Sequence, residues 1–239
     1  SLEMTTRWAG RCKAVAAGLR PARAEDRLDF SGDDAAHRAA ATARQLVFGI
    51  VQGATFADLR RASAEATVQI GFDGYAIGGV SVGESEEEMM RAVESSEPFL
   101  PADKPRYAMG LGTPPQMLEL IARGIDMFDC VLPTRLARNG TAFTSNGTLN
   151  LKNAEFALDK NPIEDGCGCP ACREFTRGYI RHLVKAEEIL GLRLITLHNL
   201  HFYLNLMRRT RAAIDGGTFA EFRREFAGGY KPRHETSRD

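Results

Sequence analysis

The sequence predicts an α/β fold of four βα units, the C-terminal half of a (β/α)8 TIM barrel, followed by a region of different character. Three observations lead to this prediction. Short apolar runs alternate with helical patterns between residues 46 and 132, as in a parallel sheet with right-handed crossovers. The chain opens inside an amphipathic helix with no leading strand, which favours a barrel without its first half over an open four-stranded sheet. After residue 140 the alternation stops.

Four apolar runs are predicted as strands because they are short, nearly continuous in apolar residues and bounded by glycine or proline. They are residues 46–51, 74–77, 106–109 and 127–132. Continuous rather than alternating apolar character indicates a sheet that is covered on both faces.

The first part of the chain is expected to be a helix over residues 2–17, with Leu2, Trp8 and Val15 facing inward. Residues 18–44 are rich in Ala, Arg and Asp without apolar spacing, which is typical of a surface connection.

Helices are predicted between the strands. Residues 56–70 have helical spacing, and a helix with an acidic start is expected over residues 85–95. The residues of the first of these helices that are expected to face inward are Leu59, Ala62, Ala66 and Ile70. Thr113 is expected to cap a third helix, because the prolines that follow it suit a first helical turn.

One carboxylate, Asp129, lies inside the last predicted strand, and Arg135 and Arg138 follow it closely. Burying a carboxylate is costly, so it needs either a partner or a function. The ends of the four predicted strands carry Gln52, Gly78 with Gly79, Met109 and Asp129. Functional residues gather at such ends in α/β folds, so these residues predict a site. The alternative is that Asp129 caps a turn or pairs with Arg135.

The region after residue 140 is predicted to contain a β-hairpin over residues 142–151, turning at Asn146 and Gly147. Helices are expected near residues 173–190, from there to about 214, and over 219–226, with a frayed tail from 228. Two domains follow from this pattern: residues 1–139, with the first helix, the connection and the βα units, and residues 140–239, with the inserted subdomain and the closing helices.

A metal site is predicted from the spacing Cys-X-Cys-X2-Cys. It is formed by Cys167, Cys169 and Cys172. With one histidine these thiolates would fill the tetrahedral shell of Zn²⁺ and leave no open position, so the ion is expected to be structural. His198 and His201 both qualify as the fourth ligand, and His182 lies on the helix after the cysteine loop.

Bulk composition excludes some classes of function. The 239 residues carry a formal net charge of zero, so binding to nucleic acid must be local rather than driven by a global positive field. The sequence shows no membrane-length apolar run and no signal peptide. Five cysteines, three of them clustered, predict metal binding in a reducing compartment such as the cytoplasm.

Several stretches together resemble the tRNA-guanine transglycosylases, in particular the bacterial queuine tRNA-ribosyltransferase type. They are residues 48–53, 71–79, 103–110, 124–140, and the cysteine cluster with residues 196–199. The resemblance implies a (β/α)8 barrel with a zinc subdomain after its eighth strand, so the four strands here would be the fifth to the eighth. It also assigns the fourth zinc ligand to His198.

The resemblance implies a pentosyltransferase of queuosine biosynthesis, which exchanges the wobble guanine of certain tRNAs for a 7-deazaguanine such as preQ1 or queuine. Asp129 matches the family nucleophile, which would form a covalent bond to the ribose. Gln52, Gly78, Gly79 and Met109 match residues that bind the base.

The resemblance also implies contacts with the tRNA anticodon loop. The matching residues are Gly110, Leu111, Gly112, Thr113, Pro114, Pro115, Gln116, Thr134, Arg135, Leu136, Ala137 and Arg138. The sequence departs from the pattern at Thr113, where many family members have lysine, which puts one phosphate contact in doubt.

The first half of the family's barrel supplies a general-base aspartate, a second base-reading aspartate and an aromatic ring, none of which has a counterpart here. The chain alone is therefore expected to be inactive, and a homodimer is implied by the family. One alternative is a non-catalytic tRNA-binding or partner subunit of the same fold. Another is a metal-dependent barrel hydrolase, which would need an open metal position.

Overall fold

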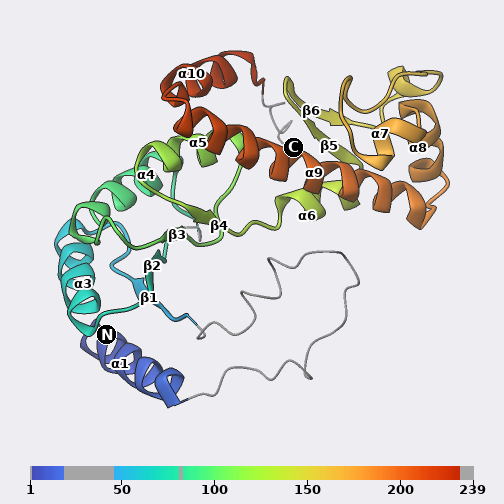
Figure 1. The fold of residues 1–239 in the computed structure, drawn as a ribbon. Helices are drawn as coiled ribbons and strands as arrows, with labels where there is room; N and C mark the ends of the chain where they lie inside the picture. The colour runs from blue at the N-terminus through green and yellow to red at the C-terminus, as the bar shows by residue number, and fades with distance from the viewer. Residues whose placement is uncertain (1, 19–45, 81–82, 232–239) are drawn as a thin grey trace. The chain divides into compact units, whose positions relative to one another are not determined.

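The computed structural model describes residues 2–18, 46–80 and 83–231 (Figure 1). The predicted connection falls almost wholly outside these residues. Contacts divide the chain into two compact units. The first contains Ser1–Met109 and Arg123–Met127, and the second contains Gly110–Ala122 and Phe128–Asp239. The domain boundary expected between residues 139 and 140 stays a prediction.

The α/β prediction is confirmed by the sheet. Its strands are β1 (Phe48–Val51), β2 (Gly74–Ile77), β3 (Arg106–Ala108) and β4 (Met127–Phe128), in that order. β1 pairs with β2 and β2 with β3 in parallel, and Phe48 lies opposite Gly74. All four residues of β2 are buried. Strand and helix alternate along the chain, which is the pattern of half a (β/α)8 barrel.

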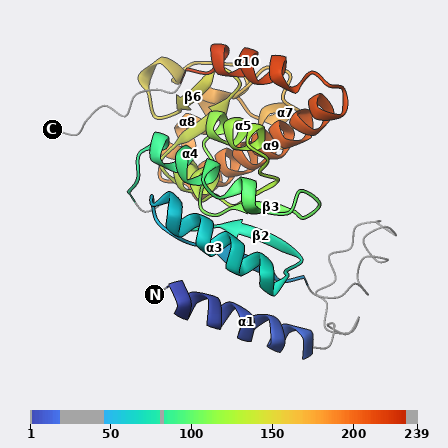
Figure 2. The same ribbon diagram turned by 90° about the vertical axis from the view of Figure 1, so that its left-hand side faces the viewer.

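The helices of the first unit are α1 (Leu2–Gly18), α3 (Ala57–Ile70) and α4 (Glu86–Glu94), with a short 3-10 helix at Glu97–Phe99. Ser85 starts α4 through a capping box, because its side chain accepts a hydrogen bond from Glu88 N–H while the Glu88 carboxylate accepts from Ser85 N–H. Figure 2 shows α1 running alongside α3, and the Lys13 ammonium donates to the carbonyl of Ile70 between them.

The face that α3 buries differs from the prediction. The buried residues are Arg60, Ser63, Ala64 and Thr67. Leu59 is 42% exposed and Ala62 is also exposed. Ala66 and Ile70 are half-buried, so the apolar spacing marks only the edge of the buried face. That face consists of small side chains together with one arginine that hydrogen-bonds to backbone carbonyls.

Two further expectations for the first part of the chain are corrected. Trp8 is 57% exposed rather than inward, and the Arg11 guanidinium lies over its ring. The predicted buried strand at 127–132 is only two residues long, Met127 is 45% exposed, and Leu132 already begins a helix. Pro133 does not stop a strand but occupies the first turn of that helix, which suits its fixed φ.

The second unit combines a hairpin with helices. β5 (Thr141–Thr144) and β6 (Gly147–Asn150) pair antiparallel, with Ser145 and Asn146 as the turn, one residue earlier than predicted. The helices are α5 (Pro114–Ala122), α6 (Leu132–Arg138), α7 (Pro170–Glu174), α8 (Arg177–Lys185), α9 (Ile189–Asp215) and α10 (Phe219–Gly229), with a 3-10 turn at Ala154–Phe156. The single helix expected over 173–190 is therefore wrong: Phe175 and Glu188 lie in extended conformations that separate three helices.

Two apolar clusters form the core of the second unit. One packs Leu151, Ile163 and Ile180 around the cysteine loop. The other packs Phe143 against Phe202 and Tyr203, with ring centroids 6.1 and 5.1 Å apart. Among the helices in the described ranges, none has the length and apolarity needed to cross a membrane.

The corrected face of α3 can be tested by placing one larger side chain on each side of the helix. Ala64→Leu should lower the free energy of unfolding of the first unit by about 1–3 kcal/mol, because Ala64 is fully buried and overpacking strains the core. Ala62→Leu, on the exposed side, should change it by less than about 0.5 kcal/mol. Denaturant unfolding followed by circular dichroism measures both, and equal effects would contradict the assigned face.

Candidate functional site

Three cysteines and one histidine of the second unit come together as predicted. Cys167 lies in the loop before α7, Cys169 is the N-cap of α7, Cys172 lies within α7, and His198 lies in α9. All four ligand atoms lie within 4.8 Å of one another. His201 is half-buried and His182 is exposed, and neither belongs to this group.

The distances in the cluster fit a four-coordinate zinc ion. His198 Nδ1 lies 3.7, 3.6 and 3.3 Å from the sulfurs of Cys167, Cys169 and Cys172. Zinc bonds of about 2.0 Å to nitrogen and 2.3 Å to sulfur require ligand atoms about 3.5 Å apart in a tetrahedron. The set therefore fits structural Zn²⁺, which it would enclose without an open coordination position.

A hydrogen bond on the far side of His198 selects its ligand atom. His198 is fully buried, and its Nε2 lies 2.6 Å from the carbonyl oxygen of Phe143. A proton on Nε2 donates to that carbonyl, which leaves Nδ1 unprotonated and facing the sulfurs. The cysteine spacing left both His198 and His201 open, because the choice depends on where α9 meets β5. The family resemblance assigned His198, and the cluster confirms that assignment.

Asn199 extends this anchor, a role that the sequence pattern did not predict. Its Oδ1 accepts from the N–H of Phe143 at 2.9 Å, and its Nδ2 donates to the carbonyls of Pro133 and Thr141. The side chain is fully buried and bonded at both ends of its amide. α9 is therefore tied to β5 and to α6 at the point where it supplies the metal ligand.

The thiols interact strongly. Hydrogen bonding with Cys172, helped by His198 and against the effect of burial, lowers the pKa of Cys169 to about 3. The hydrogen bond with Cys169 and burial together raise the pKa of Cys172 far above its ordinary value. One thiolate therefore disfavours ionisation of the neighbouring thiols, because their negative charges would repel each other. A divalent cation among the three sulfurs would remove that repulsion.

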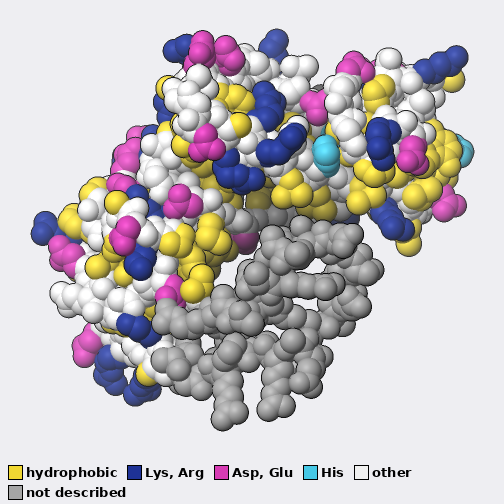
Figure 3. All heavy atoms as spheres, in the orientation of Figure 1, with side chains coloured by type: hydrophobic (Ala, Val, Ile, Leu, Met, Phe, Trp, Pro, Cys, Tyr) yellow, Lys and Arg dark blue, Asp and Glu magenta, His cyan; other side chains and the backbone are white. Residues whose placement is uncertain are grey.

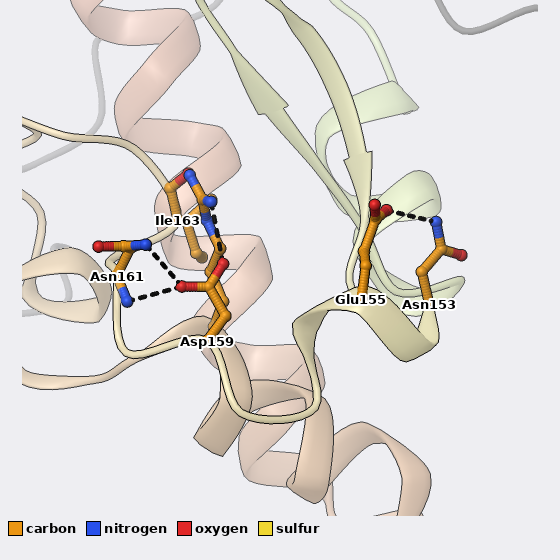
Figure 4. Close-up of polar contacts among 6 residues, drawn as sticks. Asn153, Glu155, Asp159, Asn161 and Ile163 are labelled. Carbon is orange, nitrogen blue, oxygen red and sulfur yellow. Dashed lines mark hydrogen bonds and ion pairs between the residues drawn. The ribbon is translucent and has the colours of Figure 1, made fainter.

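The loop that leads into the cysteines is fixed by Arg177 and Asp159. Figure 4 shows Asp159 with Asn161 beside it. The two side chains pair at 3.1 Å, and Arg177 also donates to the carbonyl of Ile163. Asn161 donates to the same carboxylate through its backbone and its side chain. Burial would raise the pKa of Asp159, but these hydrogen bonds and the Arg177 charge outweigh it and hold the pKa below its ordinary value.

Asp129 lies immediately after β4 and is exposed, not buried as the sequence suggested. Its Oδ1 accepts a hydrogen bond of 2.7 Å from the N–H of Gly110. Gly110 has φ +71°, a conformation that favours glycine. The carboxylate is therefore oriented by backbone while remaining accessible to solvent.

The base-binding residues predicted after β1 and β2 contact one another in the first unit. A Cβ on Gly78 would stand 2.7 Å from Gln52 Nε2, and one on Gly79 would stand 2.8 Å from Gln52 Oε1. A Cβ on Gly78 would also stand 2.9 Å from Ile50 Cγ2, and Gly79 has φ +65°, a conformation that favours glycine. Met109 is half-buried after β3, and its N–H donates to the carbonyl of Ile77.

The residues predicted to contact RNA differ in their exposure within the second unit, and Thr113, Pro115, Gln116, Thr134 and Leu136 are half-buried. Arg135 and Arg138 are exposed on α6. Leu111, Gly112, Pro114 and Ala137 are buried. The carbonyl of Gly112 accepts from the hydroxyl of Tyr203, which fixes the loop before α5. The roles predicted for these residues and for the base-binding residues stay predictions.

A half-barrel of βα units that leads into a closed Cys3His centre defines a barrel-type α/β protein with structural zinc. Comparison with known proteins narrows this class. The model of the family described as "Queuine tRNA-ribosyltransferase" matches residues 1–232. The chain belongs to the queuine tRNA-ribosyltransferase family.

Curated relatives agree with this family. The chain is 53% identical over 226 residues to "Queuine tRNA-ribosyltransferase" of Symbiobacterium thermophilum, covering 95% of this chain and 51% of the relative. It is 50% identical over 229 residues to the protein of that name from Pelotomaculum thermopropionicum, covering 96% and 55%. The chain therefore spans about half the length of these relatives.

The metal centre can be tested by substituting its ligands. Cys172→Ser and His198→Gln should each reduce bound zinc well below one ion per chain and unfold much of the second unit, because structural zinc contributes about 10 kcal/mol or more to folding. His201→Gln and Cys130→Ser, outside the cluster, should keep full zinc. Metal analysis and circular dichroism provide the readouts. If His198→Gln kept one zinc ion per chain and His201→Gln lost it, the assignment of His198 as the fourth ligand would be contradicted.

Proposed function

We propose that the protein containing this chain exchanges guanine in tRNA for a 7-deazaguanine, with Asp129 as the nucleophile. The observation that carries the proposal is the exposed Asp129 carboxylate at the C-terminal end of a barrel strand, held by a backbone N–H. Family membership supports the same reaction. An aspartate is ionised at neutral pH, so it can attack without first losing a proton.

The proposed reaction is a double displacement at the ribose C1′. An Asp129 oxygen attacks C1′ as the bond from C1′ to N9 of guanine breaks, and guanine leaves with the electron pair and takes up a proton. The incoming base then attacks C1′ through N9, loses its N9 proton, and releases the Asp129 carboxylate. Two inversions give net retention, as in retaining glycoside hydrolysis.

Gln52, Gly78, Gly79 and Met109 are proposed to bind the base. The amide of Gln52 offers both a donor and an acceptor to the polar edge of a purine. The glycines allow the base to approach the backbone, and the polarisable thioether of Met109 suits contact with a ring face.

The second unit is proposed to bind the anticodon loop through arginines. Arg135 and Arg138 are exposed on α6, the helix that follows Asp129. Figure 3 shows further Lys and Arg side chains gathered over α9 and α10, where the exposed arginines include Arg208, Arg209 and Arg211. Arginines position an RNA by contacting its phosphates, without reading its sequence.

We also propose a homodimer and a cytoplasmic location, where reducing conditions keep the zinc-ligand thiols free of disulfides.

The role of Asp129 can be tested in a chimera that joins this chain to the part of the Symbiobacterium relative that it does not span. Asp129→Asn should abolish the covalent tRNA adduct and reduce exchange of labelled guanine by at least about 10³-fold, since an amide is not a nucleophile here. Asp215→Asn, at the exposed end of α9, is the matched control. Denaturing gel electrophoresis detects the adduct. If the Asp129→Asn variant formed a normal amount of the covalent adduct, the assignment of Asp129 as the nucleophile would be rejected.

The chain by itself is expected to be inactive, because the family's general base and second base-reading aspartate have no counterpart in it. Labelled guanine should not enter tRNA above background with this chain alone, whereas the chimera should incorporate it. Zinc content and circular dichroism confirm that the chain used is folded. Turnover by the isolated chain would show that these groups are dispensable.

A further inference from the structure

Arg60 is a fully buried arginine whose hydrogen bonds lead to the proposed base site. It lies on the inner face of α3. Its Nη2 donates to the carbonyl oxygens of Gly78 at 3.1 Å and Gly79 at 3.3 Å, and its Nε donates to the carbonyl of Ala54 at 2.5 Å. One guanidinium therefore connects the segment after β1 with the segment after β2.

The same helix also holds Gln52 in place. The backbone N–H of Gln52 donates to the hydroxyl of Ser63, one turn along α3 from Arg60, at 3.0 Å. The close approach between Arg60 and Gly53 leaves no room for a side chain, since a Cβ there would stand 2.7 Å from the backbone nitrogen of Arg60. Arg60 and Ser63 of α3 therefore fix the backbone positions of Gln52 and of the two glycines.

Packing alone does not explain an arginine at this position. Burial lowers the pKa of Arg60, although the charge of Glu84 opposes this effect. Among the described residues, its Nη1 is buried without a hydrogen-bond partner. A buried cation with incomplete bonding costs free energy that an apolar side chain of similar length would not. Its specific contribution is the directed binding of three carbonyl groups.

The orientation of these carbonyls determines where the next amides point. In a trans peptide the C=O and the following N–H point in opposite directions, and no described peptide is cis. Because the carbonyls of Gly78 and Gly79 point to Arg60, the N–H groups of Gly79 and Val80 point away from α3. Two adjacent N–H donors beside the Gln52 amide match the acceptor edge of a purine, its O6 and N7.

We propose that Arg60 is a positioning residue for base recognition: by binding the carbonyls of Gly78 and Gly79, it aims the amides of Gly79 and Val80 at the purine or deazapurine base. This inference rests on the proposed function, because it assumes that the base binds beside Gln52 and the two glycines.

The kinetic test uses the chimera with Arg60→Met, Arg60→Lys and the control Arg61→Met, which removes an exposed arginine paired with Glu65. Arg60→Met should raise the KM for guanine at least about tenfold, since two hydrogen bonds to the base are misaligned, and the KM for preQ1 by a smaller factor, because a 7-deazaguanine has carbon at position 7 and accepts only through O6. The KM for tRNA should change less than about threefold. Arg60→Lys should lie between, because an ammonium cannot reach all three carbonyls at once.

A merely structural role gives a different result. If the KM values for base and tRNA rise together, or if activity falls only in proportion to the folded fraction, the proposal is overturned. An unchanged KM for the base in folded Arg60→Met protein would overturn it as well.

Hydrogen exchange on this chain separates failure of the inference from failure of the proposed function. Arg60→Lys should speed exchange at the amides of Gly79 and Val80 while β2 stays protected. No change there, or uniform loosening of the first unit, overturns the positioning role even if the chimera exchanges bases. If the unsubstituted chimera shows no exchange reaction, the proposed function fails, and the hydrogen-exchange result still decides whether Arg60 orients these amides.

Discussion

The hydrogen bond from Gly110 N–H to Asp129 is the contact on which the proposed chemistry depends most. It joins a residue just after β3 to one just after β4 and orients one oxygen of an exposed carboxylate. The left-handed conformation of Gly110 makes glycine the favourable residue there. A nucleophile must be both accessible and oriented, and this backbone donor orients the carboxylate while it stays exposed.

The zinc centre belongs to the second unit, which also contains Asp129, and it connects to other parts of that unit through hydrogen bonds. Its ligand His198 and the adjacent Asn199 hold Phe143 by its carbonyl and its N–H, and Asn199 also binds the carbonyl of Pro133. Pro133 belongs to α6, the helix that exposes Arg135 and Arg138. The metal ligands, the hairpin and the proposed RNA-contact helix are therefore connected by a short chain of buried polar contacts, through which a structural ion would help to position the proposed RNA contacts.

The sequence predicted the features that depend on local pattern. β1, β2 and β3 lie within the predicted strands because each apolar run of the sequence stops at or just before a glycine. The cysteine spacing identified three metal ligands. Features that depend on tertiary contacts were missed. The buried position of Arg60 on α3 was missed, because its guanidinium donates to the carbonyls of Gly78 and Gly79, which belong to the next βα unit. The strand at Asp129 was drawn too long because apolar Val131 and Leu132 resemble a strand, although Val131 is 61% exposed.

The most direct test of the central claim is to locate the covalent bond. The chimera would be denatured during turnover with tRNA, digested with nuclease and protease, and its peptides analysed by mass spectrometry. We expect a ribose-containing adduct on the peptide that includes Asp129, with fragmentation placing it on Asp129 itself. An adduct on another residue, or turnover with no adduct under conditions that trap the intermediate, would contradict it.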